Sequence, residues 1–377
     1  MASVTPLSGI VVIEIGHSIA APYAGMILGE LGAEVIKVEN PKGGDAARGW
    51  GPPFQEGAST CFHSVNRAKR GITIDLADPA DAARLRALIL ERAHVVIHNL
   101  KYGALDKYGL AASDLVAEKP GLVWCNLAAF GAAGPLRDRP GYDPMMQAYS
   151  GLMSLFGEDG RPPVRVTASI IDMGAAMWSA IGILAALNER QHTGKGGIVD
   201  TSLLETGLAW MTIMLPSYLA TGQLPVRQGS GVDMIVPYQA FATADGHMMV
   251  AAGNDNLFRR LCCALDRPGL GEDPRFRTNG DRVVHRGELI PILAEIFVQK
   301  PRAYWADLLE TAGIPNGPIH TLDQVVADAQ VKALGILQRK PGSELALIGL
   351  PLSFDGERPP FTKVAPVLGE HNAAVLG

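Results

Sequence analysis

Two short stretches of the chain carry residues whose types could do chemistry. The first is Gly16-His17-Ser18-Ile19-Ala20, which follows an apolar run and nearly matches the G-x-S-x-G nucleophile elbow of α/β-hydrolases. Its last residue is Ala20 instead of glycine, and it follows the first expected strand instead of a central one. A serine nucleophile therefore stays an alternative. The favoured interpretation is a helix N-terminus whose free N–H groups face a ligand or water.

The second stretch contains Asp172, which immediately precedes the apolar run 173–187. In that position Asp172 is expected to act as an N-cap, because its carboxylate can accept backbone N–H groups at the positive end of the helix dipole. A carboxylate held ionised in this way could also attack an activated acyl group and form a mixed anhydride. The residue types alone leave both roles open.

Other common catalytic patterns are missing from the sequence. Its GxG triplets lack the third glycine of a dinucleotide site, and Gly194-Lys195 is followed by Gly196 instead of the hydroxyl residue of a P-loop. The nine histidines form no HxH or HExxH, and the four cysteines form no CxxC. The sequence therefore disfavours NAD and ATP sites, and we predict no metal.

The elements around these stretches alternate between strands and helices. The apolar runs 10–15, 35–38, 72–76, 94–98 and 122–127 are typical of buried parallel strands, and amphipathic segments at 21–31 and 78–93 lie between them. This alternation predicts an α/β fold with a doubly wound, Rossmann-like large domain and a mainly parallel sheet. Because they directly follow the expected strand 10–15, His17 and Ser18 should lie at the carboxyl edge of that sheet.

The pattern changes after residue 226. Segments 238–243 and 248–252 flank Asp245-Gly246 and predict a hairpin, and amphipathic stretches follow at 256–265, 283–299 and 302–312. We therefore expect a large domain at 1–200, a linker helix at 201–226 interrupted at Pro216, a smaller α+β domain at 227–318, and a return to the large domain at 319–377.

The composition and the apolar segments of the chain indicate which classes of partner to expect. The chain has 377 residues, and Lys plus Arg total 33 against 38 Asp plus Glu, so the net charge of -5 offers no basic excess for nucleic acid. The N-terminus lacks the pattern of a signal peptide, and the run 173–187 is shorter than the ~20 residues that span a bilayer. We expect a cytoplasmic protein without a membrane segment, in which 173–187 is a buried helix.

Several separated motifs, taken in order, resemble the family III coenzyme A transferases over essentially the whole chain. This group also includes α-methylacyl-CoA racemases and formyl-CoA and carnitine-CoA transferases. The motifs are Gly16-His17-Ser18-Ile19-Ala20-Ala21-Pro22, Gly32-Ala33-Glu34-Val35-Ile36-Lys37-Val38-Glu39, Gly44-Asp45 with Arg48-Gly49-Trp50, Asn66 with Lys69-Arg70-Gly71, Gly141-Tyr142-Asp143, Ile171-Asp172, Thr193-Gly194-Lys195-Gly196 and Leu368-Gly369-Glu370-His371.

The resemblance implies an interlocked homodimer, with acyl-CoA as a substrate and no permanently bound cofactor. It implies that Asp172 is the nucleophile, and we expect Asp143 to help shape the pocket. Positions along the CoA path of the family match His17, Ile19, Ala20, Ile74, Asn99, Leu100, Lys101, Lys107, Arg139 and Tyr142. The three cations in this set suit the phosphates of CoA, whereas the apolar members could equally belong to the core.

The expected activity is transfer of CoA from an acyl-CoA to a free carboxylic acid, a short dicarboxylate, through aspartyl anhydride and aspartyl-CoA intermediates. The segment Val236-Pro237-Tyr238-Gln239-Ala240-Phe241 resembles transferases that act on succinyl-CoA. Formyl transfer is disfavoured because formyl-CoA transferases carry Arg where this chain has Asn40. Two alternatives stay open: a racemase of 2-methylacyl-CoA, although racemases carry His in place of Tyr142, and a non-catalytic CoA-binding protein.

Overall fold

The computed structural model describes residues 5–377, which divide into two compact units. The first unit contains the chain up to residue 152 together with 166–212 and 328–377. The second contains 153–165 and 213–327. The division thus begins at 213 instead of the expected 227 and ends at 327 instead of 318, and the short segment 153–165 joins the second unit.

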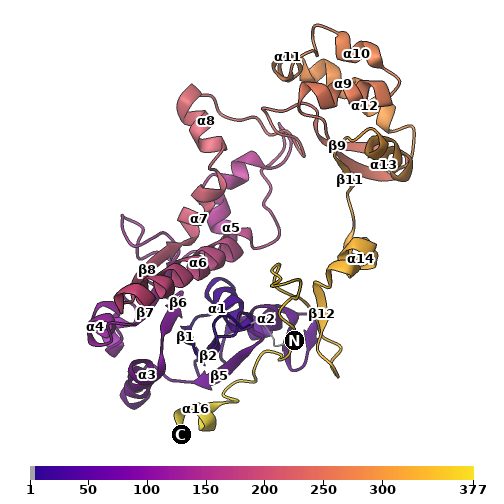
Figure 1. Cartoon of the computed structure of the whole chain (residues 1–377). Coiled ribbons are helices and arrows are strands. Elements are labelled where there is room, and N and C mark those ends of the chain that lie inside the picture. The colour runs from indigo at the N-terminus through magenta and orange to yellow at the C-terminus, as the bar shows by residue number, and fades with distance from the viewer. Residues whose placement is uncertain (1–4) are drawn as a thin grey trace. The chain divides into compact units, whose positions relative to one another are not determined.

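A six-stranded parallel sheet forms the centre of the first unit (Figure 1). Its spatial order is β5 (Lys69–Thr73), β2 (Glu34–Glu39), β1 (Val11–Ile15), β6 (Val95–His98), β7 (Val123–Ala128) and β8 (Gly197–Ser202). Every neighbouring pair is parallel. The strand order reverses between β1 and β6, and open α/β sheets bind ligands in the crevice beyond the carboxyl ends at such a point.

Helices cover both faces of this sheet, which explains the nearly continuous apolar strands. On one face, Val12 belongs to a core shared with α1 (Ala20–Glu30) and α6 (Ile170–Thr193). On the other face, Ile13 belongs to a core shared with α3 (Pro79–Arg92) and α4 (Ala112–Glu118). The prediction of an α/β fold with a parallel central sheet is confirmed.

The rest of the first unit consists of short elements around the sheet. The C-terminal segment returns to the edge strand β5, where the Asn372 side chain accepts the backbone N–H of Thr73 at 2.8 Å. The remaining elements are η1 (Ala46–Gly49), β3 (Phe54–Gln55), β4 (Ala58–Ser59), α2 (Thr60–Asn66), η2 (Asp106–Tyr108), α5 (Asp143–Tyr149), η3 (Leu152–Leu155, which runs into the second unit), α7 (Leu203–Trp210), α15 (Ala329–Leu334), β12 (Leu337–Arg339), β13 (Ala346–Ile348) and α16 (Asn372–Leu376).

The second unit packs helices on a three-stranded antiparallel sheet. Its strands are β11 (Asn316–Pro318), β10 (Gly246–Ala251) and β9 (Tyr238–Thr243), so the hairpin is present, with its two-residue turn at 244–245. Phe241, Met248 and Phe258 belong to one buried cluster. The helices are α8 (Met214–Thr221), α9 (Asp255–Ala264), α10 (Pro268–Glu272), α11 (Asn279–Val284), α12 (Arg286–Phe297), α13 (Arg302–Thr311) and α14 (Leu322–Ala327).

Two expected elements need correction. The strand expected at 72–76 lies at Lys69–Thr73, because its polar first residue Lys69 is buried against an acidic partner and carries no hydrophobic signal. The linker helix expected at 201–226 is two helices, α7 and α8, which belong to different units. Pro216 cannot continue a helix from Thr212, so the chain breaks at 211–213, and α8 begins with the proline in its first turn.

The apolar run expected to be a buried helix is longer and less buried than predicted. Helix α6 spans 24 residues, and it is the one helix within residues 5–377 that is long and apolar enough to cross a bilayer. A core helix that covers a sheet meets the same criterion. Ala176 and Ile183 face the core, whereas Met177, Trp178 and Ile181 are 40–54% exposed. One face of α6 is therefore open in the single chain.

Candidate active site

The crevice at the strand-order reversal is closed at its base by two loops that hold each other. The backbone N–H of His17, just after β1, donates to Asn99 Oδ1 at 3.0 Å, and Asn99 Nδ2 donates back to the His17 carbonyl at 2.8 Å. Asn99 directly follows β6. The carboxyl ends of the two central strands are therefore fixed to one another where a ligand is expected.

Two neighbouring cavities of the first unit open at this point. The larger, about 600 Å³, runs along the ends of β1, β2 and β5 and is lined by Ile74 and Lys107. The second, about 350 Å³, is lined by Lys101 and Asp172. His17, Leu100 and Ala104 line both. A long ligand with an anionic end and a reacting end could therefore extend from one cavity into the other.

Nearly all the residues predicted to lie on the CoA path line these cavities. They are His17, Ala20, Ile74, Asn99, Leu100, Lys101, Lys107, Arg139 and Tyr142. Ile19 is the exception: it precedes α1 and lines neither cavity. Helix α1 has no side-chain cap, and its first residue Ala20 lines the second cavity, in agreement with a helix N-terminus that faces a ligand site.

Asp172 is not the N-cap that the sequence predicts. Helix α6 begins at Ile170, so Asp172 is its third residue and lies in the first turn. The cap comes from Asp143, the first residue of α5, whose Oδ2 accepts the backbone N–H groups of Ile171 at 2.7 Å and Asp172 at 3.2 Å. Tertiary structure thus supplies the capping carboxylate, and the Asp172 carboxylate stays free for another role.

The surroundings of Asp172 disfavour its ionised form. Burial, and then the negative charge of Asp143, raise the pKa of Asp172 to about 7. Within residues 5–377 no hydrogen bond or ion pair is formed by its carboxylate. A partly buried carboxylate without a partner, at the wall of a cavity, is a basic and available nucleophile or proton acceptor.

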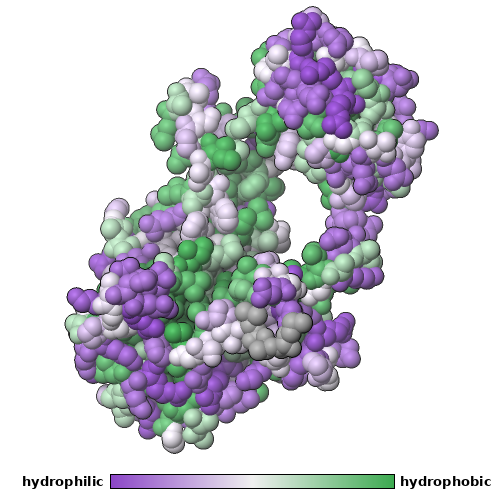
Figure 2. Space-filling view, in the orientation of Figure 1, coloured by the Kyte–Doolittle hydropathy of each residue, from purple (hydrophilic) through white to green (hydrophobic). Residues whose placement is uncertain are grey.

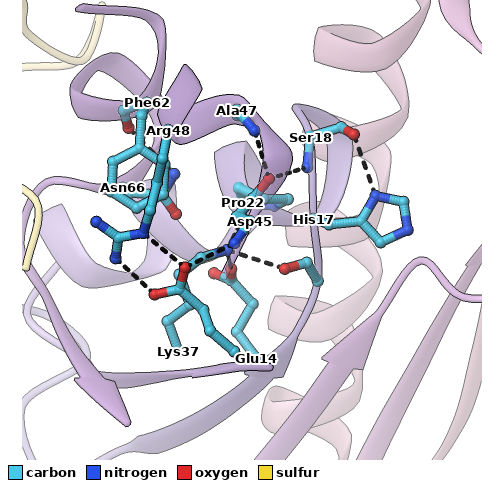
Figure 3. A network of polar contacts seen from close by, with 12 residues as sticks. Glu14, His17, Ser18, Pro22, Lys37, Asp45, Ala47, Arg48, Phe62 and Asn66 are labelled. Atoms are coloured by element: carbon cyan, nitrogen blue, oxygen red, sulfur yellow. Dashed lines mark hydrogen bonds and ion pairs between the residues drawn. The ribbon is translucent and has the colours of Figure 1, made fainter. Parts of the chain in front are cut away.

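A network of buried charges lies next to the His17 loop (Figure 3). Lys37 Nζ donates to Glu14 Oε1 at 3.1 Å, to Asp45 Oδ2 at 3.0 Å and to the Gly16 carbonyl at 2.9 Å. Asp45 in turn accepts the backbone N–H of Ser18 at 3.0 Å. The network therefore fixes both ends of the His17 loop, including Ser18, whose φ of 65° is left-handed.

Lys69 extends the network beneath α1. Its Nζ lies 2.6 Å from Glu14 Oε2 and donates to the Pro22 carbonyl at 2.7 Å. A Cβ on Gly25 would lie 2.0 Å from Glu14 Oε2, so this helix position must be glycine for the pair to fit. Burial lowers the pKa of Lys69 to about 7. Burial also opposes the charge of Lys37, but the carboxylates of Glu14 and Asp45 raise the pKa of Lys37 overall.

The geometry does not support a serine hydrolase. His17 Nδ1 lies 3.1 Å from Ser18 Oγ, but the nearby carboxylate of Asp45 accepts the Ser18 backbone N–H and forms no hydrogen bond with the His17 ring. Among residues 5–377, no carboxylate is hydrogen-bonded to the His17 ring as the third member of a triad would be. Burial lowers the pKa of His98 to about 4. Throughout the described chain, 5–377, no three His, Cys, Asp or Glu side chains form a group that could hold a metal ion.

Sequence reasoning missed several residues at the site. Trp50 and Arg137 line the second cavity, and the Arg137 guanidinium lies 4.3 Å from the centre of the Tyr102 ring. Gln147, fully buried on α5, binds Asp143 at 2.6 Å. The i, i+4 spacing of Asp143 and Gln147 is a signal in the sequence that could have linked them.

The chain is similar over nearly its full length to known CoA-transferases. Residues 7–372 match the sequence profile of CoA-transferase family III. The chain is 38% identical to the succinate–glutarate CoA-transferase of Agrobacterium fabrum, covering 98% of this chain and 95% of that protein. It is 35% identical to the human succinyl-CoA:glutarate CoA-transferase, covering 100% and 86%.

The fold is similar to solved structures as well. A crystal structure of a CAIB/BAIF family protein from Brucella suis matches with a TM-score of 0.87 and 39% identity, covering 98% of both chains. CoA thioesters are the substrates of this class of enzyme. The chain belongs to CoA-transferase family III.

Proposed function

We propose that this enzyme transfers CoA from one dicarboxylic acid to another, with Asp172 as the nucleophile. The observation that carries the proposal is the free carboxylate of Asp172, which is partly buried at the wall of a cavity and has a pKa raised to about 7. A carboxylate nucleophile is the group that this chemistry requires, because CoA can be stored on it as a thioester while one acid leaves and the next enters.

The reaction proceeds through exchanges at three carbonyl carbons, those of the donor, of Asp172 and of the acceptor. Asp172 attacks the thioester carbonyl of the donor, the C–S bond breaks, and a mixed anhydride and CoA thiolate form. The thiolate attacks the Asp172 carbonyl, releases the donor acid and leaves aspartyl-CoA. The acceptor carboxylate then displaces the thiolate to form a second anhydride, and the thiolate attacks the acceptor carbonyl to release the new acyl-CoA and Asp172. Atoms and charge balance without an added reactant.

Local cations would hold the phosphates of CoA in spite of the net charge of -5. Lys107 lines the larger cavity, and Lys101 and Arg139 line the second. Charges that line a concave site act on a bound anion more strongly than the distant surface does, because low-dielectric walls focus their field. We assign the nucleotide end of CoA to the larger cavity, with its phosphates extending towards Lys101 and Arg139, and the thioester end to the second cavity.

The substrate class rests on the relatives. The Agrobacterium fabrum and human proteins act on succinate or succinyl-CoA and glutarate, and a relative from Acetobacter aceti, 34% identical, is an acetyl-CoA:oxalate CoA-transferase. All these acceptors are dicarboxylates. The second carboxylate of such an acid needs a cation near Asp172, and Arg137, a cation not assigned to the phosphates, lines the same cavity.

We propose that the functional enzyme is a homodimer and that it acts in the cytoplasm. Hydrophobic residues are open to view over α6 and α7 in Figure 2. By exposed fraction, the large hydrophobic residues of these two helices include Trp178, Ile181, Leu208 and Trp210, each 41–54% exposed. Exposed apolar surface of this extent on neighbouring helices is typical of an interface. We propose that a second copy of the chain covers this surface in an interlocked homodimer. Sedimentation of the folded protein as a stable, active monomer would contradict this proposal.

A substrate screen tests the proposed activity. Succinyl-CoA, acetyl-CoA and 2-methylacyl-CoA donors are incubated with mono- and dicarboxylic acids, and new thioesters are detected by mass. We expect new CoA esters chiefly with dicarboxylates, and none with the Asp172→Ala variant. Exchange of the α-proton of 2-methylacyl-CoA with deuterated solvent, without any acceptor acid, would instead identify a racemase and contradict the proposal.

A further inference from the structure

The N-terminus of α6 is capped in an unusual way. Ser169 occupies the N-cap position, where a serine usually accepts an N–H group of the first turn, but its side chain makes no such bond. The Asp143 carboxylate, from α5, accepts the N–H groups of Ile171 and Asp172 instead. An Asp in the first turn of a helix is itself attracted to these N–H groups, so Asp143 has taken the place that Asp172 could occupy.

Gln147 fixes Asp143 in this position. Its Nε2 donates to Asp143 Oδ1 at 2.6 Å and to the Val166 carbonyl at 3.0 Å, while its Oε1 accepts the Val166 N–H at 2.9 Å. Asp143 is 2% exposed and Gln147 is 0% exposed. Three N–H donors therefore point at the two oxygens of Asp143, the arrangement that suits an ionised carboxylate.

We propose that Asp143, held by Gln147, is the positioning residue for the nucleophile: it occupies the first N–H groups of α6 and so keeps the Asp172 carboxylate unbound and turned to the cavity. The inference rests on the proposed role of Asp172. It assigns to Asp143 a place beneath the nucleophile, instead of the pocket-shaping role expected from the sequence.

The charge of Asp143 adds to this effect. Burial first, and then Asp143, raise the pKa of Asp172. The other titratable or charged groups that line the second cavity are His17, Lys101, Tyr102, Arg137, Arg139 and Tyr142. Asp143 is not among the residues that line this cavity, but its carboxylate accepts the backbone N–H of Asp172. A more basic carboxylate attacks a thioester faster, so the arrangement favours the first chemical step.

The test is the pH dependence of kcat/KM for succinyl-CoA with glutarate as acceptor, which reports groups of the free enzyme. Asp143→Asn keeps an oxygen that can accept the two N–H groups and removes the charge. We expect its acid limb to move to lower pH by about one unit, because Asp172 ionises more easily. Ser169→Ala is the matched control and should leave the profile unchanged. An unchanged limb in folded Asp143→Asn would show that the charge of Asp143 does not act on Asp172 and would overturn the electrostatic part of the proposal.

A second variant covers the case in which Asp143→Asn does not fold. Gln147→Met keeps the charge of Asp143 but removes the hydrogen bond from Gln147 that fixes its carboxylate. We therefore expect kcat to fall about tenfold or more, with little change in the KM for succinyl-CoA. Activity equal to that of Ser169→Ala would contradict the proposal. Failure of the proposed function is a separate result: the wild-type enzyme would then form no acyl adduct at Asp172, whatever the variants do.

Discussion

Two groups of charged residues in the first unit, the network around Lys37 and the pair Asp143 and Asp172, differ in how their charges are matched. In the network of Glu14, Lys37, Asp45 and Lys69, two carboxylates meet two amino groups, and most bonds are close to 3 Å, although burial lowers the pKa of Lys69 to about 7. In the pair Asp143 and Asp172, two carboxylates meet, and the available N–H donors reach only Asp143.

The difference separates structure from reactivity. Burying a charge is unfavourable unless it is paired and hydrogen-bonded, so the matched network is a stable brace that fixes the backbone of the loop. Asp172 keeps the unfavourable part of its burial, which is expressed as a raised pKa. The proposed reactivity of Asp172 therefore coincides with the place where the charge of a carboxylate is not compensated.

The largest expected effect comes from breaking the matched network. Lys37→Met leaves Asp45 without its ammonium partner and the Gly16 carbonyl without a donor. We expect a loss of about 3–5 kcal/mol in the free energy of unfolding, measured by urea denaturation. The control is Lys42→Met, whose ion pair with Asp75 is exposed, with an expected loss of about 0–1 kcal/mol. Equal losses would mean that the network is not a brace.

The unmatched carboxylate should behave in the opposite way. The folded-state pKa of Asp172, about 7, lies above the ordinary 3.8, so the folded state binds more protons than the unfolded state between these values. Stability from this group is present at low pH and lost as the pH rises towards 7. Asp172→Asn removes that loss.

The measurement is the unfolding free energy of Asp172→Asn and wild type from pH 4 to 8. We expect the variant to gain on the order of 1–3 kcal/mol over the wild type at pH 8, with a smaller difference at pH 4. The exposed Asp138→Asn serves as a control and should show no such trend. A variant that loses stability at pH 8 would mean that Asp172 is a structural cap after all.

The smallest expected effect concerns the cations on the cavity walls. Lys107→Glu should weaken CoA binding several-fold and reduce its dependence on salt, because one phosphate contact is replaced by repulsion. Lys195→Glu makes the same change in net charge at an exposed position that lines neither cavity. Calorimetric titration with CoA at two salt concentrations compares them. Equal affinities would remove the local electrostatic argument.

The same comparison explains what the sequence could predict. Strands such as β1 and β7 are apolar because both faces of the sheet are covered, so their nearly continuous apolar runs could be recognised in the sequence. The start of β5 was missed because Lys69 and Arg70 are polar, and the burial of Lys69 depends on Glu14, 55 positions earlier in the chain. Charge pairing between distant elements leaves no periodic signal.

The site was predictable in its residues and not in its arrangement. Asp172 was identified from its position before an apolar run, but its expected capping role was wrong, since the cap is Asp143, on another helix. The carboxyl ends of β1 and β6 were expected to carry ligand contacts, and His17 and Asn99 do line cavities there. Gln147 and Arg137 were missed because their contacts exist only in the folded chain.

The most direct test of the account is to trap the acyl group on the enzyme. The wild-type protein and Asp172→Asn are incubated with succinyl-CoA and hydroxylamine, and their peptides are analysed by mass spectrometry. An anhydride or thioester of a side-chain carboxylate reacts with hydroxylamine, so we predict a hydroxamate on Asp172 in the wild type and none in the variant. Turnover of succinyl-CoA by the wild type with Asp172 unmodified would contradict the account.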